Sequence, residues 1–334
     1  MIIVRYRGGL GNQMFQYAFS YALSKRFPNE KVYADISHYE IQKEHNGFEL
    51  NKCFGIQVRE MKKSILKKYS PFLVVPDIFN RVPRLIKEYV ESSIQFKYHD
   101  KRMKEMDSSN IFYYCQEAHN TYDANLFDEI ETQLGNSSIE CLYLDGLWQD
   151  IRYFDAYRND LKEIFKLPDI GEIGLKGRNV VGIHVRCGDF LKSKFDICSS
   201  DYYKKALKIV NDYYIDSESD EYGQADCDCN EVELNVEQPQ CCVFTDDIVR
   251  AMQIIGSSPN IQYINNGING SLKDMAMMGC CRQLIISNST FSFWAAYLND
   301  VDVVVAPKYS VICQNRKYEL NTPDSWIRID NSNE

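Results

Sequence analysis

The sequence predicts an α/β fold in which parallel strands alternate with helices, because two stretches of the chain repeat the order strand, helix, strand. The first stretch opens the chain, with strands expected at residues 2–7 and 31–35 on either side of a helix at residues 14–27. The second stretch alternates from residue 180 to residue 287. Between them, at residues 166–178, a proline and three glycines interrupt the pattern, which indicates a connection between two domains.

Local patterns justify the elements of each domain. The first helix is indicated by apolar residues at helical spacing, namely Phe15, Phe19, Ala22 and Leu23. In the second stretch we expect strands at 180–185, 242–245, 262–264 and 284–287, and helices at 201–214, 248–255 and 272–280. We therefore predict two Rossmann-like domains, residues 1–170 with a helical insertion and residues 171–334.

The composition supports two globular domains and argues against nucleic-acid binding. The chain has 334 residues, of which 45% are hydrophobic, and this is enough for a large core. Its net charge is −9, whereas contacts with nucleic-acid phosphates require a dense basic face, so no nucleic-acid partner is expected. The first residues already form a strand, and no stretch approaches the ~20 apolar residues that span a bilayer. We expect a cytoplasmic protein.

Two segments have unusual charge. Residues 59–104 hold 12 Lys or Arg against 5 Asp or Glu, which favours a solvated helical face, with peripheral attachment to the inner face of an anionic membrane as the alternative. Residues 216–237 hold nine acidic residues and few apolar ones, which predicts a mobile loop.

The twelve cysteines are interpreted as mostly reduced, buried small hydrophobes, since they are scattered through strand and helix patterns. Cys227 and Cys229, followed by Cys241 and Cys242, superficially resemble a set of metal ligands. Their spacings match no standard zinc ribbon. Unrelated thiols are the favoured interpretation, and no metal is expected.

Polar side chains follow three apolar strands of the second domain, in residues 181–190, 243–247 and 284–293. Ligands of open α/β sheets bind outside the carboxyl ends of the strands. His184 and Arg186 lie two residues apart and therefore on the same face of an extended strand. The planar fork of arginine suits a diphosphate, although a structural ion pair at the sheet edge is an equally simple explanation.

The other polar residues at these strand ends carry two interpretations each. Residues 287–292 read Ser-Asn-Ser-Thr-Phe-Ser and start a helix, where hydroxyls and free amides make a phosphate cradle, and capping alone explains only one of them. Asp274 fits a capping box that begins at Ser271, and Asp246 and Asp247 fit helix-starting acids, so each is either a cap or a ligand-binding group.

A glycine-rich loop at residues 8–14 follows the first strand and opens a helix, so its backbone amides can face an anion. Compared with the dinucleotide-binding motif G-x-G-x-x-G, the loop supplies the first two glycines as Gly9 and Gly11, and Asp35 lies where the ribose-binding acid is expected. The third glycine is replaced by Met14, which disfavours an NAD(P)-dependent oxidoreductase. Asn12 is either a ligand-binding group or a plain N-cap.

Four motifs together resemble the α-1,2-fucosyltransferase family, glycosyltransferase family 11. They are residues 8–18, 184–190, 244–247 and 286–296, and they occur in the family's order over nearly the whole chain. The resemblance implies a GT-B architecture, with two facing Rossmann-like domains and a cleft between them. It also implies GDP-fucose as donor, a galactose-terminated oligosaccharide or lipid-linked glycan as acceptor, inversion at the anomeric carbon and no metal.

The resemblance also assigns residues to the donor. His184 and Asp274 lie near the guanosine and Arg186 on the diphosphate, and the other donor-binding residues are Gly11, Asn12, Asp246, Ser289, Thr290, Phe291 and Ser292. The family has a second arginine where this chain has Cys187, which should point away from the Arg186 side and into packing.

Catalysis is expected to depend on Arg186 and the helix that starts at Ser289, which stabilise the charge that develops on GDP. Asp189 is the nearest candidate for the base that deprotonates the acceptor, although a neighbouring cation lowers the pKa of a carboxyl and makes it a poorer base. A late, weakly assisted deprotonation fits the residues equally well. A non-catalytic glycan-binding module is the remaining alternative to an enzyme.

Overall fold

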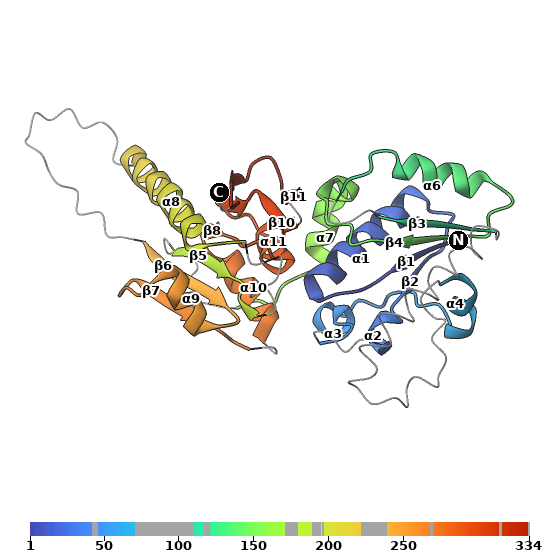
Figure 1. The fold of residues 1–334 in the computed structure, drawn as a ribbon, viewed down its shortest axis with the longest axis horizontal. Helices are drawn as coiled ribbons and strands as arrows, with labels where there is room; N and C mark the ends of the chain where they lie inside the picture. The colour runs from blue at the N-terminus through green and yellow to red at the C-terminus, as the bar shows by residue number, and fades with distance from the viewer. Residues whose placement is uncertain are drawn as a thin grey trace, which may run out of the picture. The chain divides into compact units, whose positions relative to one another are not determined.

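The computed structural model describes residues 1–41, 46–70, 110–116, 121–170, 180–188, 195, 197–221, 239–267, 270–313 and 316–332. Its chain divides into two compact units, Met1–Tyr157 and Arg158–Glu334. Each unit is built on a parallel sheet flanked by helices, as the sequence predicts (Figure 1). The facing arrangement of the units and the cleft between them stay predictions.

The first unit is an α/β unit with a four-stranded sheet in the order β2-β1-β4-β3. Its strands are β1 (Ile2–Arg5), β2 (Val32–Asp35), β3 (Ile111–Cys115) and β4 (Cys141–Asp145). Its α-helices are α1 (Leu10–Arg26), α2 (His38–Ile41), α3 (Leu50–Phe54), α4 (Lys63–Tyr69) and α6 (Leu126–Gly135), followed by the short 3-10 helices η2 (Ile151–Tyr153) and η3 (Asp155–Tyr157). All three neighbouring strand pairs are parallel.

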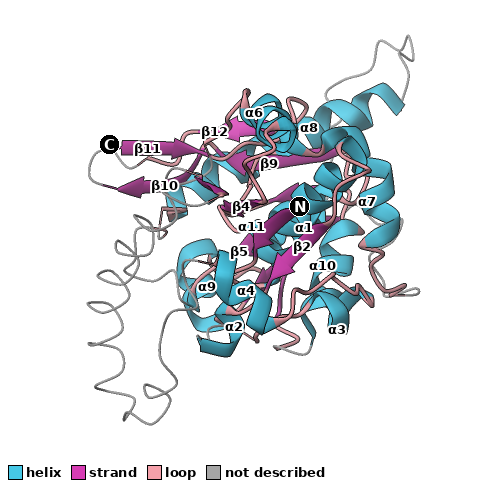
Figure 2. Cartoon of the chain, turned by 90° about the vertical axis from the view of Figure 1, so that its right-hand side faces the viewer, coloured by secondary structure: helices cyan, strands magenta, loops and turns pink. Residues whose placement is uncertain are grey.

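The second unit has a six-stranded sheet in the order β12-β9-β8-β5-β6-β7. Its parallel strands are β5 (Val180–Val185), β6 (Gln240–Thr245), β7 (Ile261–Ile264), β8 (Gln283–Ile285), β9 (Val303–Pro307) and β12 (Ile327–Ile329). Its helices are α7 (Arg158–Ile164), α8 (Ser200–Glu221), α9 (Ile248–Ile255), α10 (Ser271–Gly279) and α11 (Thr290–Tyr297). An antiparallel pair, β10 (Tyr309–Cys313) and β11 (Arg316–Glu319), stands apart from this sheet (Figure 2).

The sequence places most of these elements correctly but misplaces the start of the first helix. Helix α1 begins at Leu10 rather than at residue 14, because Gly9 is its N-cap and the glycine-rich segment itself enters the helix. Strands β9 and β12 and the β10–β11 pair were not expected from the sequence, although residues 303–306 form a continuous apolar run that signals a buried strand.

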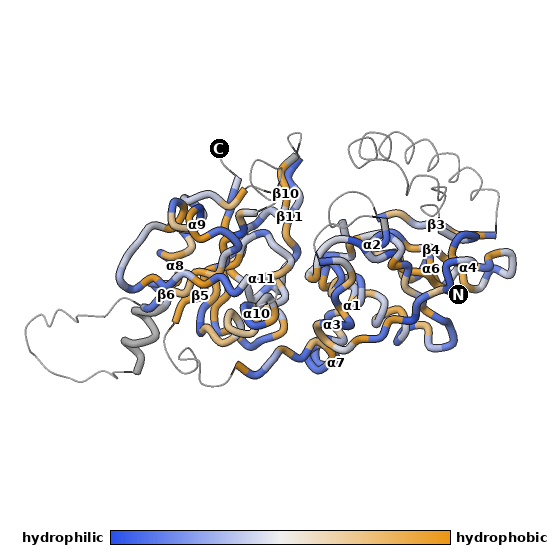
Figure 3. The backbone as a smooth tube through the Cα atoms, turned by 90° about the horizontal axis from the view of Figure 1, so that it is seen from below, coloured by the Kyte–Doolittle hydropathy of each residue, from blue (hydrophilic) through white to orange (hydrophobic). Residues whose placement is uncertain are grey.

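Both sheets are covered by apolar cores, as Figure 3 shows by the hydrophobic course of strands such as β5. In the second unit Val181, Ile183 and Val185 of β5 pack with Tyr202 and Tyr203 of α8. Their alternation along the strand leaves His184 on the opposite face from these apolar residues.

The division between the units falls after Tyr157, earlier than the boundary after residue 170 that the sequence suggests. Helix α7 belongs to the second unit because Arg158 donates two hydrogen bonds, of 3.1 and 3.0 Å, to the carbonyl oxygen of Tyr297. Lys162, one turn further along α7, pairs with Asp300 at 2.6 Å. None of the helices that the structure describes is long and apolar enough to cross a membrane.

Candidate donor-binding site

The polar strand ends of the second unit meet at one edge of the sheet. The chain leaves β5 toward β6 and later returns to form β8 on the other side, so the strand order reverses between β5 and β8. Ligands of open α/β sheets bind outside the carboxyl ends at such a reversal. His184 and Arg186 come from β5 and its end, Asp246 follows β6, and Ser287 follows β8.

His184 joins the two strands at this reversal. Its ring is buried, with 5% exposed, and Nδ1 lies 2.9 Å from Ser287 Oγ. Burial, with a smaller contribution from the charge of Arg186, lowers the pKa of His184 to about 3. The imidazole is therefore neutral near pH 7, and it offers hydrogen bonds rather than charge.

Arg186 is held by a carboxylate from the neighbouring strand. Its Nη1 lies 2.8 Å from Asp246 Oδ2, and about 30% of each side chain is exposed. The other oxygen, Oδ1, accepts a hydrogen bond of 2.8 Å from the backbone N–H of Cys187. A Cβ at Gly188 would lie 2.4 Å from Asp246 Oδ2, so this glycine lets the loop pass against the carboxylate. The ion pair expected as the structural alternative is present, and it orients a guanidinium that reaches the surface.

Cys187 packs in the core, as predicted. It is buried against the apolar face of β5 and helix α8, and burial raises the pKa of its thiol to about 11. This position therefore supplies no charge to the site, and Arg186 supplies the guanidinium in this motif.

Of the residues 287–292 that were expected to form a phosphate cradle, some are used by the helix start itself. Ser289 is the N-cap of α11 and accepts a hydrogen bond of 3.3 Å from the N–H of Phe291. Ser292 is buried and donates to the carbonyl oxygen of Ser289 at 3.2 Å. Thr290 and Phe291 are partly exposed in the first helical turn, where backbone N–H groups point outward. Ser289 and Ser292 thus shape the helix start. Because the Ser289 cap uses the N–H of Phe291, the N–H of Thr290 is the candidate ligand contact in this turn.

Asp246, Asp247 and Asp274 make different contacts in the structure. Asp247 is the N-cap of α9 and accepts a hydrogen bond of 3.0 Å from the N–H of Arg250, whereas Asp246 pairs with Arg186. The capping box at Ser271 is wrong, because Gly270 is the N-cap of α10 and makes no side-chain cap. Asp274 instead accepts a hydrogen bond from Asn266, and partial burial raises the pKa of its carboxyl.

The glycine-rich loop of the first unit is fixed by side chains of its own motif. Gly8 has a φ of +80°, a conformation that favours glycine. Asn12 is not an N-cap, because Gly9 holds that position, and its Oδ1 accepts a hydrogen bond of 2.7 Å from Gln149. Gly11 is buried in the first turn of α1.

Two glutamines of this motif hold the loop, and sequence reasoning assigned them no role. Gln13 donates to the carbonyl oxygens of Gly8 and Gly47 at 3.0 and 2.9 Å. Gln16 accepts from the N–H of Arg7 at 3.1 Å and donates to its carbonyl oxygen at 3.2 Å. Their signal in the sequence is a pair of amides next to the buried apolar residues Met14, Phe15 and Phe19 of the helix.

Asp35 cannot serve as the ribose-binding acid of a dinucleotide site, because the protein already uses both of its oxygens. It is fully buried and accepts hydrogen bonds from the N–H of Ser37 at 3.0 Å, from Ser70 Oγ at 3.1 Å and from the Tyr143 hydroxyl. The oxidoreductase interpretation therefore loses its key acid.

Other expectations lie outside the described residues. They include the candidate base Asp189, the larger part of the basic segment 59–104, and the acidic stretch from residue 222 onward together with Cys227 and Cys229. Within the described ranges, no three His, Cys, Asp or Glu side chains come together as ligands of a metal ion. The expectation of a metal-independent reaction stays a prediction.

The fold defines an α/β protein with a candidate ligand site at the carboxyl edge of a parallel sheet. The family model described as glycosyl transferase family 11 matches residues 1–330, and the chain belongs to this family of glycosyltransferases.

Three relatives and one solved structure illustrate the similarity. The O-antigen biosynthesis glycosyltransferase WbnK of Escherichia coli is 28% identical, over 96% of this chain and 98% of its own length. An alpha-1,2-colitosyltransferase of Escherichia coli is 26% identical, over 99% of each chain. Galactoside alpha-(1,2)-fucosyltransferase 1 of Saimiri sciureus is 24% identical over 47% of this chain and 39% of its own. NodZ alpha-1,6-fucosyltransferase co-crystallized with GDP has 17% identity and a TM-score of 0.39, covering 89% of this chain and 92% of its own.

Proposed function

We propose that the protein transfers L-fucose from GDP-fucose to the 2-hydroxyl of a terminal galactose in a glycan, with inversion and without a metal ion. The observation that carries the proposal is the meeting of Arg186, Asp246, His184 and the start of α11 at the strand reversal of the second unit. A nucleoside diphosphate fits this chemistry, because a guanidinium and helix N-terminal N–H groups both bind phosphate oxygens.

The mechanism follows from charge. In an inverting transfer, the acceptor oxygen forms its bond to the anomeric carbon as the bond to the β-phosphate breaks, and negative charge grows on GDP. Arg186, oriented by Asp246, stabilises that charge together with the N–H group of Thr290 at the start of α11. The acceptor proton passes to a base, for which Asp189 is our candidate, or to water late in the reaction.

Binding of nucleotides tests this proposal directly. Thermal unfolding is measured without added metal in the presence of GDP, GDP-fucose, UDP or NAD, because a ligand that binds only the folded state raises the melting temperature according to its concentration and Kd. We expect shifts with GDP and GDP-fucose alone. Lactose, a galactoside, should then greatly accelerate the release of GDP above slow hydrolysis, and the 2-linked product should be seen by NMR. A shift with NAD alone would replace the proposal by the oxidoreductase.

A second donor sugar is favoured by one comparison. A relative that matches 99% of this chain is named alpha-1,2-colitosyltransferase. GDP-activated colitose should therefore be compared with GDP-fucose at equal concentration, and kcat/KM for the two donors decides which sugar this chain transfers.

The natural acceptor and the site of action are also proposals. We propose a galactose-terminated oligosaccharide or a lipid-linked glycan, made as a precursor of cell-surface polysaccharide. Co-sedimentation with vesicles that contain anionic lipid would test peripheral membrane contact.

A further inference from the structure

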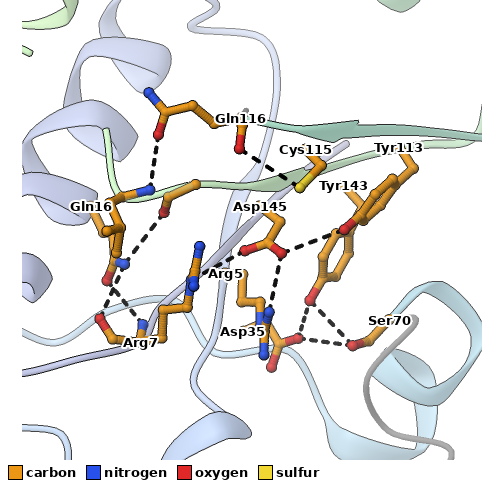
Figure 4. A network of polar contacts seen from close by, with 12 residues as sticks. Arg5, Arg7, Gln16, Asp35, Ser70, Tyr113, Cys115, Gln116, Tyr143 and Asp145 are labelled. Carbon is orange, nitrogen blue, oxygen red and sulfur yellow. Dashed lines mark hydrogen bonds and ion pairs between the residues drawn. The ribbon is translucent and has the colours of Figure 1, made fainter. Parts of the chain in front are cut away.

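A second polar cluster occupies the carboxyl edge of the sheet in the first unit, and the proposed donor site does not use it (Figure 4). Arg5 ends β1 and Asp145 ends the neighbouring β4, and Arg5 Nη1 donates to Asp145 Oδ2 at 3.1 Å. The Tyr113 hydroxyl, from β3, lies 3.4 Å from the same oxygen. The chain leaves β1 toward β2 and enters β4 from β3 on the other side, so the strand order reverses here as well.

One half of this cluster is structural. Asp35, Tyr143 and Ser70 are joined by hydrogen bonds, in which the Ser70 and Tyr143 hydroxyls lie 3.2 Å apart and both contact Asp35 Oδ2 (Figure 4). All three side chains are buried. Because the acceptor oxygens of Asp35 are occupied, this half leaves little for a ligand.

The other half is not satisfied. Arg7 Nε and Asp145 Oδ1 lie 3.5 Å apart, and both atoms are buried without a hydrogen-bond partner in the described part of the chain. Buried polar atoms without partners are uncommon in folded proteins and cost stability. The backbone of Arg7 is nevertheless fixed, since Gln16 binds both its N–H and its carbonyl oxygen (Figure 4). The side chain of Arg7 is 37% exposed, so the rest of the guanidinium reaches the surface.

The charges of the cluster favour an uncharged ligand. The formal charges balance, since Arg5 and Arg7 lie in the same cluster as Asp35 and Asp145, so an anion gains little net attraction there. His38 lies in the field of both arginines, and mainly burial lowers its pKa to about 4, so it adds no positive charge near pH 7. A sugar hydroxyl suits this setting, because it accepts a hydrogen bond from a guanidinium and donates one to a carboxylate or a tyrosine hydroxyl.

We propose that Arg7 binds a hydroxyl group of the acceptor sugar at this edge of the first unit, with Asp145 as the residue that positions its guanidinium. This inference rests on the proposed function, because it assumes a glycan acceptor. It adds a binding residue, Arg7, and a positioning residue, Asp145.

The test compares Arg7→Gln with a matched control, Arg26→Gln. Arg26 is a more exposed arginine of the same unit, in a surface ion pair of 3.1 Å with Asp128. Initial rates are measured with lactose as acceptor, together with the Kd of GDP by calorimetry and the slow hydrolysis of GDP-fucose without acceptor. Arg7→Gln should raise the KM for lactose about tenfold to hundredfold, which is what loss of a hydrogen bond to a charged group implies. The Kd of GDP and the hydrolysis rate should not change, and Arg26→Gln should behave like wild type.

Each other outcome is decisive. An unchanged KM for lactose in Arg7→Gln overturns the inference, and a Kd for GDP that rises as much as the KM moves Arg7 to the donor. If wild type binds GDP but fucosylates no galactoside, the proposed function fails and this inference with it.

Two further variants complete the test. Arg7→Lys keeps the charge beside Asp145 and loses the planar fork, so it replaces Arg7→Gln if that variant does not fold, with a smaller rise in the KM for lactose expected. Asp145→Asn should raise the KM for lactose while leaving kcat unchanged, whereas a merely structural role would lower the melting temperature and leave the KM unchanged.

Discussion

Replacing Arg186 by alanine should separate catalysis from stability. Arg186 and Asp246 are each about 30% exposed, and a solvent-exposed ion pair contributes about 1 kcal/mol or less to stability. Asp246 keeps its hydrogen bond from the N–H of Cys187 in the variant, so the loop after β5 should hold its shape. Loss of one donor that stabilises developing charge typically lowers kcat by about 10²- to 10³-fold. We therefore expect a rate loss of that size, with a change of about 1 kcal/mol or less in the free energy of unfolding.

The assay needs two controls. Arg282→Ala removes another arginine of the second unit, which pairs with Asp302 at 3.0 Å on the surface, and it should leave the rate unchanged. The double variant Arg186→Ala with Asp246→Asn shows whether the rate loss comes from the missing guanidinium or from an uncovered carboxylate. GDP release with lactose gives kcat, and urea unfolding gives stability. Wild-type transfer by Arg186→Ala would refute the assignment, and unfolding of the variant at low urea would make Arg186 a structural residue.

Three further predictions use other contacts. Asp246→Asn should raise the KM for the donor about two- to fivefold by loosening Arg186 and leave the KM for lactose unchanged, which steady-state kinetics can measure. Gly8→Ala should destabilise the chain by about 1–2 kcal/mol and weaken GDP-fucose binding, because the new Cβ would lie 2.3 Å from the Asn12 side chain at a φ of +80°. Gly55→Ala, with a φ of +68° and nothing within 4 Å, is its control in urea unfolding, and equal losses would exclude the contact with Asn12. Below pH 6.5 the unfolded chain binds a proton at His184, whereas the folded protein binds it only near pH 3. The free energy of unfolding should therefore fall as the pH is lowered from 6.5 to 3, and this fall should be smaller in His184→Gln. Equal slopes of unfolding free energy against pH in the two proteins would contradict this prediction.

The fold could be predicted from the sequence where local patterns are strong. Strand β5 is apolar except at Gly182 and His184, and the helices around it have amphipathic spacing, so their positions follow from periodicity. The start of α1 did not follow, because glycines at the beginning of a helix look like a loop until the N-cap at Gly9 is seen. Strand β9 has a local signal in the apolar run 303–306, whereas the edge strand β12 joins the sheet through its pairing with β9, which no local pattern specifies.

The candidate site could be predicted only in part. The sequence indicated that Arg186 and Asp246 follow apolar strands of the same domain, but it could not tell which of Asp246 and Asp247 caps a helix and which holds the arginine. That distinction depends on the two residues at the end of a strand pointing to different sides. The roles of Gln13 and Gln16 were also missed, because their partners are backbone atoms of a loop whose course is set by tertiary structure.

The two units share one feature where the strand order reverses, an ion pair between an arginine and an aspartate from an adjacent strand. In the second unit the pair is tight, at 2.8 Å between Arg186 and Asp246, and in the first unit Arg7 stands 3.5 Å from Asp145. A carboxylate beside an arginine lowers the net charge that a ligand meets, so discrimination among ligands depends more on the direction of the guanidinium than on charge alone. The tight pair suits a diphosphate whose charge grows during the reaction, since a guanidinium fixed in advance needs no reorganisation when the bond breaks. The looser pair suits an uncharged hydroxyl, which can accept a hydrogen bond from the exposed part of the Arg7 guanidinium.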